Sequence, residues 1–78
     1  MKFPLYRKLS NDLRFYKIES NLCFKEIQIM GKKVISHQIE AKQFPEVNLI
    51  RDLIQTNEFY LMSSREEFES YEKPLKEG

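Results

Sequence analysis

The sequence has few of the residue types that build disulfides, metal centres or long loops. Its 78 residues include one cysteine, one histidine, two glycines, three prolines and no tryptophan. A single cysteine cannot form an internal disulfide, and a closed zinc site needs four good ligands. We therefore expect no disulfide, no metal and no cofactor. The cysteine usage indicates a reducing compartment, and so a cytoplasmic location.

Long apolar runs are missing as well. No uninterrupted apolar segment approaches the roughly 18 residues that a membrane-spanning helix requires. The basic start of the chain, residues 1–8, is not followed by the apolar stretch of a secretory signal. We expect a protein without a membrane segment.

The composition is that of a small globular protein. Apolar residues make up 41% of the chain and charged residues 32%, which predicts one folded domain over residues 1–78. A domain of this size buries only about 60% of the surface that its unfolded chain exposes. Small domains without disulfides or metals often gain further burial by oligomerising, so association with a second chain is expected.

Residues 5–39 have the pattern of two β-hairpins. The first turn is formed by residues 10–12, and the second by Gly31-Lys32, where glycine tolerates positive φ. In the second hairpin Ile27 and Ile29 share one face, and Phe24 is out of phase with them. This phase change predicts a β-bulge near residues 25–26. A further short strand is predicted over 58–63.

Two helices complete the predicted fold. Residues 45–55 place five apolar side chains on one arc of a helix, namely Val47, Leu49, Ile50, Leu53 and Ile54. A C-terminal helix over 65–73 is predicted from the capping box that begins at Ser64, with Pro74 as its limit. The fold class is α+β: a small antiparallel sheet packed by the amphipathic helix and the C-terminal helix, with both helices expected on one face.

Positive and negative charges are divided between the two halves of the chain. Residues 1–43 contain nine basic and four acidic residues, and residues 44–78 contain four basic and eight acidic residues. Opposite charges on two surfaces can orient a self-associating pair. They can equally cancel within one folded monomer, and the sequence leaves both arrangements open.

No arrangement of residues indicates catalysis. His37 and Cys23 could face each other across the second hairpin, but a lone cysteine on a strand is more often a small buried side chain. The acidic residues Glu66, Glu69 and Glu72 are expected on the solvent-facing side of the C-terminal helix. We therefore predict no catalytic residues, no metal ligands and a protein that is not an enzyme.

The candidate interaction surface consists of cations and aromatic rings from the first three strands. Its residues are Tyr6, Arg7, Lys8, Arg14, Tyr16, Lys17 and Lys25. Sheets that bind single-stranded nucleic acid use such residues, because rings stack on bases and cations bind phosphates. Any half-buried sheet also shows interleaved rings and charges, so this composition alone is weakly specific.

The function predicted first is a small non-enzymatic protein-interaction module, of which a self-associating adaptor or regulator is one form. In that interpretation the strand 5–9 leaves an unprotected sheet edge, charges orient the pair, and Phe15, Tyr16 or Phe59 supplies apolar contact. The alternative is a single-stranded nucleic-acid-binding domain that uses the basic and aromatic strands. A monomer that does neither is the competing possibility. The expected partners are thus protein, self or other, and then nucleic acid.

Overall fold

The computed structural model describes residues 2–77, and the side chains of residues 2–72. Along the chain the elements are β1 (Leu5–Leu9), β2 (Arg14–Ser20), β3 (Cys23–Met30), β4 (Lys33–Glu40), α1 (Phe44–Gln55), β5 (Tyr60–Met62) and α2 (Arg65–Glu77). The predicted α+β class is confirmed, because five strands form one antiparallel sheet accompanied by two helices.

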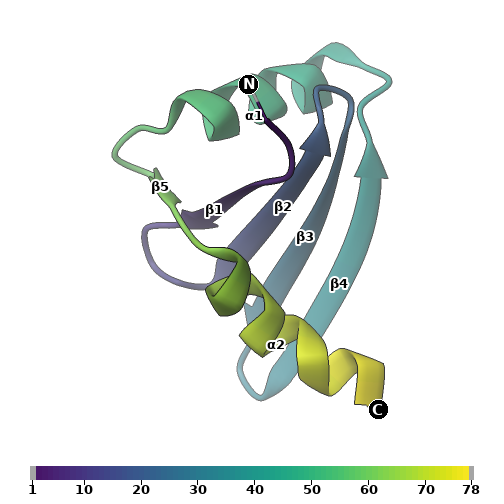
Figure 1. Cartoon of the computed structure of the whole chain (residues 1–78), viewed down its shortest axis with the longest axis vertical. Helices are drawn as coiled ribbons and strands as arrows, with labels where there is room; N and C mark the ends of the chain where they lie inside the picture. The colour runs from purple at the N-terminus through teal and green to yellow at the C-terminus, as the bar shows by residue number, and fades with distance from the viewer. Residues whose placement is uncertain (1, 78) are drawn as a thin grey trace.

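The strands lie side by side in the order β4-β3-β2-β1-β5 (Figure 1). The first four form consecutive hairpins, and α1 then carries the chain across the sheet to its opposite edge. There β5 pairs with β1, with Lys8 opposite Leu61. The prediction that β1 leaves an edge unprotected is therefore wrong, because β5 covers it. The two edge strands are β4 and β5.

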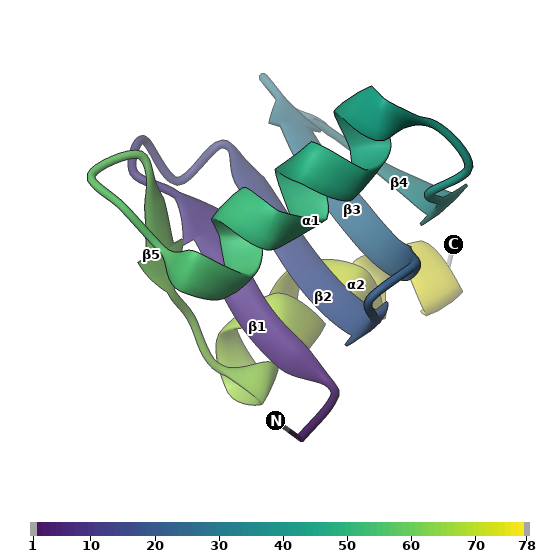
Figure 2. The same ribbon diagram turned by 90° about the horizontal axis from the view of Figure 1, so that it is seen from above.

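The helices lie on opposite faces of the sheet, and not on one face as the sequence led us to expect (Figure 2). On the α1 face, Ile50 and Leu53 belong to a buried cluster with Tyr16, Ile18 and Phe24. A second buried cluster on the other face joins three residues, Phe15, Ile27 and the α2 residue Phe68. Strands β2 and β3 carry apolar residues on both faces, and each face therefore needs its own cover.

Burial on both faces also explains the phase change in β3. The β3–β4 register runs without interruption from Cys23 to Met30, so there is no bulge at residues 25–26. Phe24 faces α1 and Ile27 faces α2. The register shift of this sheet lies between Ile18 and Ser20 of β2 instead.

Both helices begin as their sequences predict. A proline occupies the first turn of α1, where a missing N–H costs no helical hydrogen bond. At the start of α2 the main-chain N–H of Glu67 donates to Ser64 Oγ at 3.1 Å. Contrary to the prediction, α2 continues past Pro74 to Glu77, so the proline lies within its last turns. Within the described part of the chain, neither helix has the length and apolar character required to span a membrane.

Candidate interaction surface

The seven cationic and aromatic residues singled out in the sequence do not share a surface. Strand alternation puts Arg7, Arg14 and Tyr16 on the α1 face. The other four, Tyr6, Lys8, Lys17 and Lys25, point to the α2 face. A single nucleic-acid strand lying on one face of the sheet could therefore contact only part of the set.

Arg7 and Tyr16 are part of the protein interior. Arg7 is 9% exposed and Tyr16 is 2% exposed. Arg7 Nε donates to the main-chain oxygen of Leu53 at 2.7 Å, and Nη2 donates to that of Ile54 at 3.2 Å. Burial lowers the pKa of the Arg7 guanidinium and raises the pKa of the Tyr16 phenol. Neither side chain is placed to receive an external phosphate or base.

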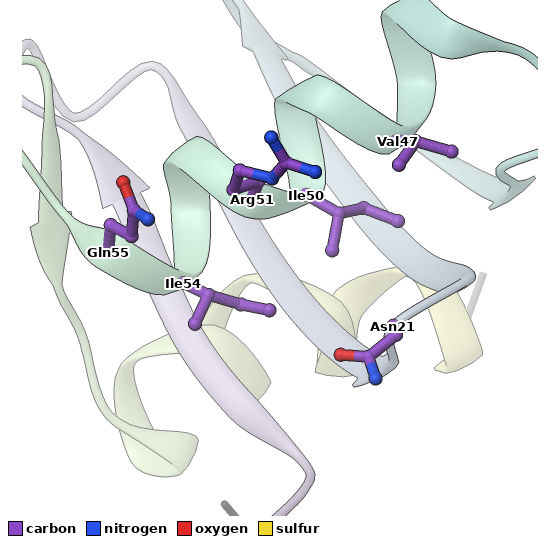
Figure 3. A pocket seen from close by; sticks show the side chains of 6 residues that line it. All are labelled: Asn21, Val47, Ile50, Arg51, Ile54 and Gln55. Carbon is purple, nitrogen blue, oxygen red and sulfur yellow. The ribbon is translucent and has the colours of Figure 1, made fainter.

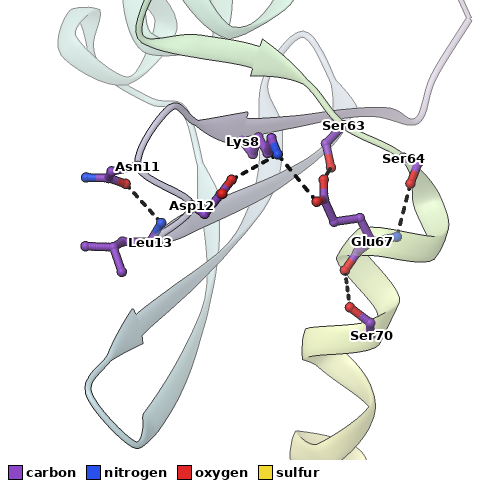
Figure 4. Close-up of polar contacts among 8 residues, drawn as sticks. All are labelled: Lys8, Asn11, Asp12, Leu13, Ser63, Ser64, Glu67 and Ser70. Carbon is purple, nitrogen blue, oxygen red and sulfur yellow. Dashed lines mark hydrogen bonds and ion pairs between the residues drawn. The ribbon is translucent and has the colours of Figure 1, made fainter.

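Two of the lysines are held by acidic residues of α2. Lys25 Nζ lies 2.5 Å from Glu72 Oε2, and Glu72 is buried. Lys8 Nζ lies 2.9 Å from Asp12 Oδ1 and 3.5 Å from Glu67 Oε2 (Figure 4). The Glu67 carboxylate also accepts a hydrogen bond from the Ser63 hydroxyl. The basic and acidic halves of the chain therefore meet within one molecule, where α2 docks on the sheet.

These pairs correct the prediction for the acidic helix. Glu66 and Glu69 are exposed as expected, but Glu72 is one of the three buried charged or polar residues among those described. Its carboxylate reaches Lys25 because α2 lies across the strand that carries this lysine. The helical wheel could not show this, since it has no information about which strand lies beneath the helix.

The remaining candidates are only partly available. The Tyr6 ring lies 5.8 Å from the Phe68 ring, measured between centroids. Arg14 Nη1 is 3.8 Å from Glu26 Oε2, and the Arg14 side chain is 44% exposed. Lys17 is half-buried and lies opposite Lys25. This leaves no continuous basic and aromatic surface among the seven residues.

The Cys23–His37 arrangement considered from the sequence does not exist. Cys23 pairs with Glu40 and His37 pairs with Glu26, so the two side chains lie on opposite faces. Cys23 Sγ instead accepts a hydrogen bond from Gln38 Nε2 at 2.9 Å. Among the described residues, no group of three or more histidine, cysteine or acidic side chains is placed to hold a metal ion.

The feature that sequence reasoning missed is the exposed edge strand β4. It is eight residues long, contains no proline, and its residues Ser36, His37 and Gln38 are all exposed. Edge strands present main-chain groups that can pair with a further strand. The alternating pattern predicted β4 itself but could not tell whether it lay inside the sheet or at its edge.

The direction of the main-chain groups in β4 follows from the hairpin. The two-residue turn Gly31-Lys32 separates the paired residues Met30 and Lys33, and the Ala41 N–H donates to Leu22 O at 2.7 Å. In an antiparallel pair, residues that exchange hydrogen bonds alternate with residues that do not. The odd-numbered residues from 33 to 41 are therefore hydrogen-bonded to β3. The even-numbered residues 34, 36, 38 and 40 direct their N–H and C=O groups away from the sheet.

The opposite edge is shorter and more apolar. Strand β5 has three residues, of which Leu61 and Met62 are exposed, and the preceding Phe59 is 58% exposed. Two hydrogen bonds tie its flanks to β1: the N–H of Ser10 donates to Phe59 O, and that of Ser63 donates to Tyr6 O. Only Phe59, of the three rings expected at an interface, lies at the surface, because Phe15 and Tyr16 are core residues.

A cavity of about 340 Å³ lies between α1 and the β2–β3 turn (Figure 3). Val47, Ile50 and Ile54 form an apolar stripe along it, and Asn21, Arg51 and Gln55 complete its lining. None of these six residues is acidic or nucleophilic. The cavity therefore offers apolar contact with three polar side chains and no arrangement for covalent chemistry.

Comparisons with known proteins give no match to this chain: no family model, no curated protein and no solved structure.

Proposed function

We propose that this protein is a small non-enzymatic interaction module that associates with a second copy of itself through sheet pairing. The observation that carries the proposal is the long edge strand β4, with exposed side chains and outward-directed main-chain groups. Strand addition at such an edge supplies main-chain hydrogen bonds, and side chains on the two faces supply specificity. A domain of this size also gains burial by pairing.

The structure changes the role given to charge. Lys8 and Lys25 already pair with Glu67 and Glu72 of the same chain. Part of the attraction between the basic half and the acidic half is thus already used within the monomer, and we do not expect charge to drive association. The proposal consequently depends on hydrogen bonding and apolar contact at an edge, for which a small interface and a modest affinity are expected.

Self-association is tested by measuring the molecular mass by sedimentation equilibrium at protein concentrations that span about a hundredfold range. The expected result is a rise from the monomer mass of 9.5 kDa toward twice that value. Because the association is not electrostatic, the rise should persist at high salt. A monomer mass under every condition would overturn the proposal.

Binding of single-stranded nucleic acid stays the alternative prediction. The seven candidate residues are divided between the two faces of the sheet. Three of them, Arg7, Lys8 and Lys25, make short polar contacts within the protein. Titration with a fluorescent oligonucleotide of mixed sequence decides it. Salt-sensitive binding by a protein that remains monomeric would put the alternative first.

A further inference from the structure

From the β4 register we infer the geometry of the pair: two β4 strands run antiparallel across a two-fold axis at His37, forming one continuous ten-stranded sheet. This inference rests on the proposed self-association and names its surface. The sheet order, in which β4 is terminal, permits a second strand to add there. The β5 edge offers only three residues.

The direction of the main-chain groups restricts the possible registers. In an antiparallel pair of identical strands, each outward-directed residue must lie opposite another outward-directed residue. The two-fold axis must then pass beside a single residue and not between two. For nearly full overlap of Lys33–Glu40, the central residue is either Ser36 or His37.

Side-chain pairing favours the axis at His37. This register sets Ile35 opposite the partner's Ile39 and Ile39 opposite the partner's Ile35, both on the α1 face. Cross-strand apolar pairs of this kind stabilise antiparallel sheets. On the other face Ser36 lies opposite the partner's Gln38, which is a polar pair, and Val34 lies opposite the partner's Glu40, which is not a matched pair. An axis at Ser36 would instead set Ile35 against a histidine and Ile39 against Lys33.

The charge order along β4 favours the antiparallel direction only slightly. The strand is preceded by Lys32, begins with Lys33 and ends with Glu40, all three exposed. Exposed Lys42 follows the strand, and its Nζ lies 3.7 Å from Glu40 Oε2. Antiparallel pairing brings Lys32 and Lys33 of one chain near the partner's Glu40, although Lys32 then also lies opposite the partner's Lys42. Parallel pairing would set all of these lysines beside the partner's lysines. Such exposed charges contribute to orientation more than to affinity.

The described side chains of α2 leave the middle of β4 uncovered. Val34 packs against the buried cluster that contains Phe68, so α2 covers the beginning of β4, while Ser36, Gln38 and Glu40 remain exposed. In an antiparallel pair the two covered ends lie at opposite ends of the interface. The middle of β4, where His37 lies, is the part that both chains leave accessible.

Cysteine crosslinking tests the geometry directly. The background variant is Cys23→Ser, which removes the single natural thiol. On it, His37→Cys places two thiols across the two-fold axis in a non-hydrogen-bonded pair, where Cα atoms are about 4.5 Å apart. That separation is within the roughly 4.4–6.8 Å that a disulfide spans. Ser36→Cys on the same strand and Met62→Cys on the other edge are the matched controls.

Under mild oxidation, followed on non-reducing gels, His37→Cys should form covalent dimer at least about tenfold faster than either control. Faster crosslinking of Ser36→Cys would overturn the register, and faster crosslinking of Met62→Cys would overturn the choice of edge. Either result in a protein that sediments as a dimer leaves the proposed self-association in place. A protein that sediments as a monomer overturns both.

A proline variant provides an independent measurement without thiols. Ser36→Pro removes an outward-directed N–H that is not used within the monomer, so the monomer should keep its far-ultraviolet circular dichroism spectrum. Its dimerisation should weaken at least about tenfold, because the ring blocks strand addition. Met62→Pro is the matched variant on the β5 edge and should dimerise normally.

His37→Lys, which sets two like charges opposite each other, should also weaken the dimer. Unchanged dimerisation of His37→Lys and of a folded Ser36→Pro would overturn the inference.

Discussion

The guanidinium of Arg7 on β1 is hydrogen-bonded to the main-chain oxygen of Leu53 near the end of α1, 46 residues later in the chain. The last carbonyl groups of a helix have no helical donors and carry partial negative charge. Arg7 supplies donors to the carbonyls of Leu53 and Ile54, and a third donation goes to Tyr6 O at 2.8 Å. One buried cation thereby fixes the end of α1 to β1, the strand that lies between β2 and β5.

Replacing Arg7 should consequently destabilise the fold. We expect Arg7→Ala to lower the free energy of unfolding by about 2–4 kcal/mol, since it removes charged hydrogen bonds and leaves buried carbonyls without donors. The measurement is urea unfolding followed by circular dichroism. Arg51→Ala, on the exposed side of the same helix, should change the free energy by less than about 0.5 kcal/mol. Equal losses in the two variants would contradict this role of Arg7.

The burial of the apolar side of α1 leads to a second prediction about stability. Leu53 has no exposed surface and lies in the buried cluster with Tyr16. Leu53→Ala should lower the free energy of unfolding by about 2–4 kcal/mol, because it leaves a cavity in the core. Gln55→Ala, an exposed position two residues later, should cost less than about 0.5 kcal/mol. Similar thermal melts for both variants would mean that the helix faces are assigned incorrectly.

The pair formed by Lys25 and Glu72 should be more strongly coupled than a surface ion pair. A double-mutant cycle with Lys25→Met and Glu72→Gln should give a coupling energy of about 1–2 kcal/mol, because the Glu72 side chain is buried. The comparison cycle uses Arg65 and Glu69, whose side chains are 70% and 50% exposed. That pair should give less than about 0.5 kcal/mol. A larger coupling in the exposed pair would argue against docking of α2 by Lys25.

Ionisation of Tyr16 should weaken the fold at alkaline pH. Burial raises the pKa of its phenol above the usual value of 10.0, and the Glu26 carboxylate raises this pKa further, while Arg14 opposes the shift. The unfolded chain releases the Tyr16 proton near pH 10, whereas the folded chain retains it, so the free energy of unfolding falls as pH rises above about 10. Tyr16→Phe cannot ionise, and its stability should fall less steeply over this interval. Parallel curves for the two proteins in urea titrations between pH 9 and 11.5 would exclude this effect.

Local patterns in the sequence determined most of the secondary structure. Strand alternation and turn residues place the hairpins, as at Gly31, whose φ of +63° suits the β3–β4 turn. The arc of apolar residues and the proline in the first turn place α1. These features depend on neighbours within a few residues, which is why a single sequence contains them.

The candidate interaction surface was not predicted correctly, because which side chains reach the surface depends on contacts between residues far apart in the chain. The alternating pattern of a strand indicates which residues share a face with Arg7 or with Tyr16. It does not show that β5 pairs with β1 or that the end of α1 lies next to Arg7. It records acidic residues in α2, but not that Glu72 lies over Lys25. Only the tertiary structure assigned these side chains to the interior.

Tertiary structure also decided which parts of the sheet remain available. The sequence predicted a strand over residues 34–39 with Ile35, His37 and Ile39 on one face, and the structure has it over Lys33–Glu40. Whether that strand lies between two others or at an edge depends on the path of α1, which carries the chain from β4 to the far side of β1. The physical reason is that nearly every residue offers the same main-chain N–H and C=O groups, whatever its side chain. A strand's neighbours are selected by the packing of the whole domain, and not by the strand's own residues.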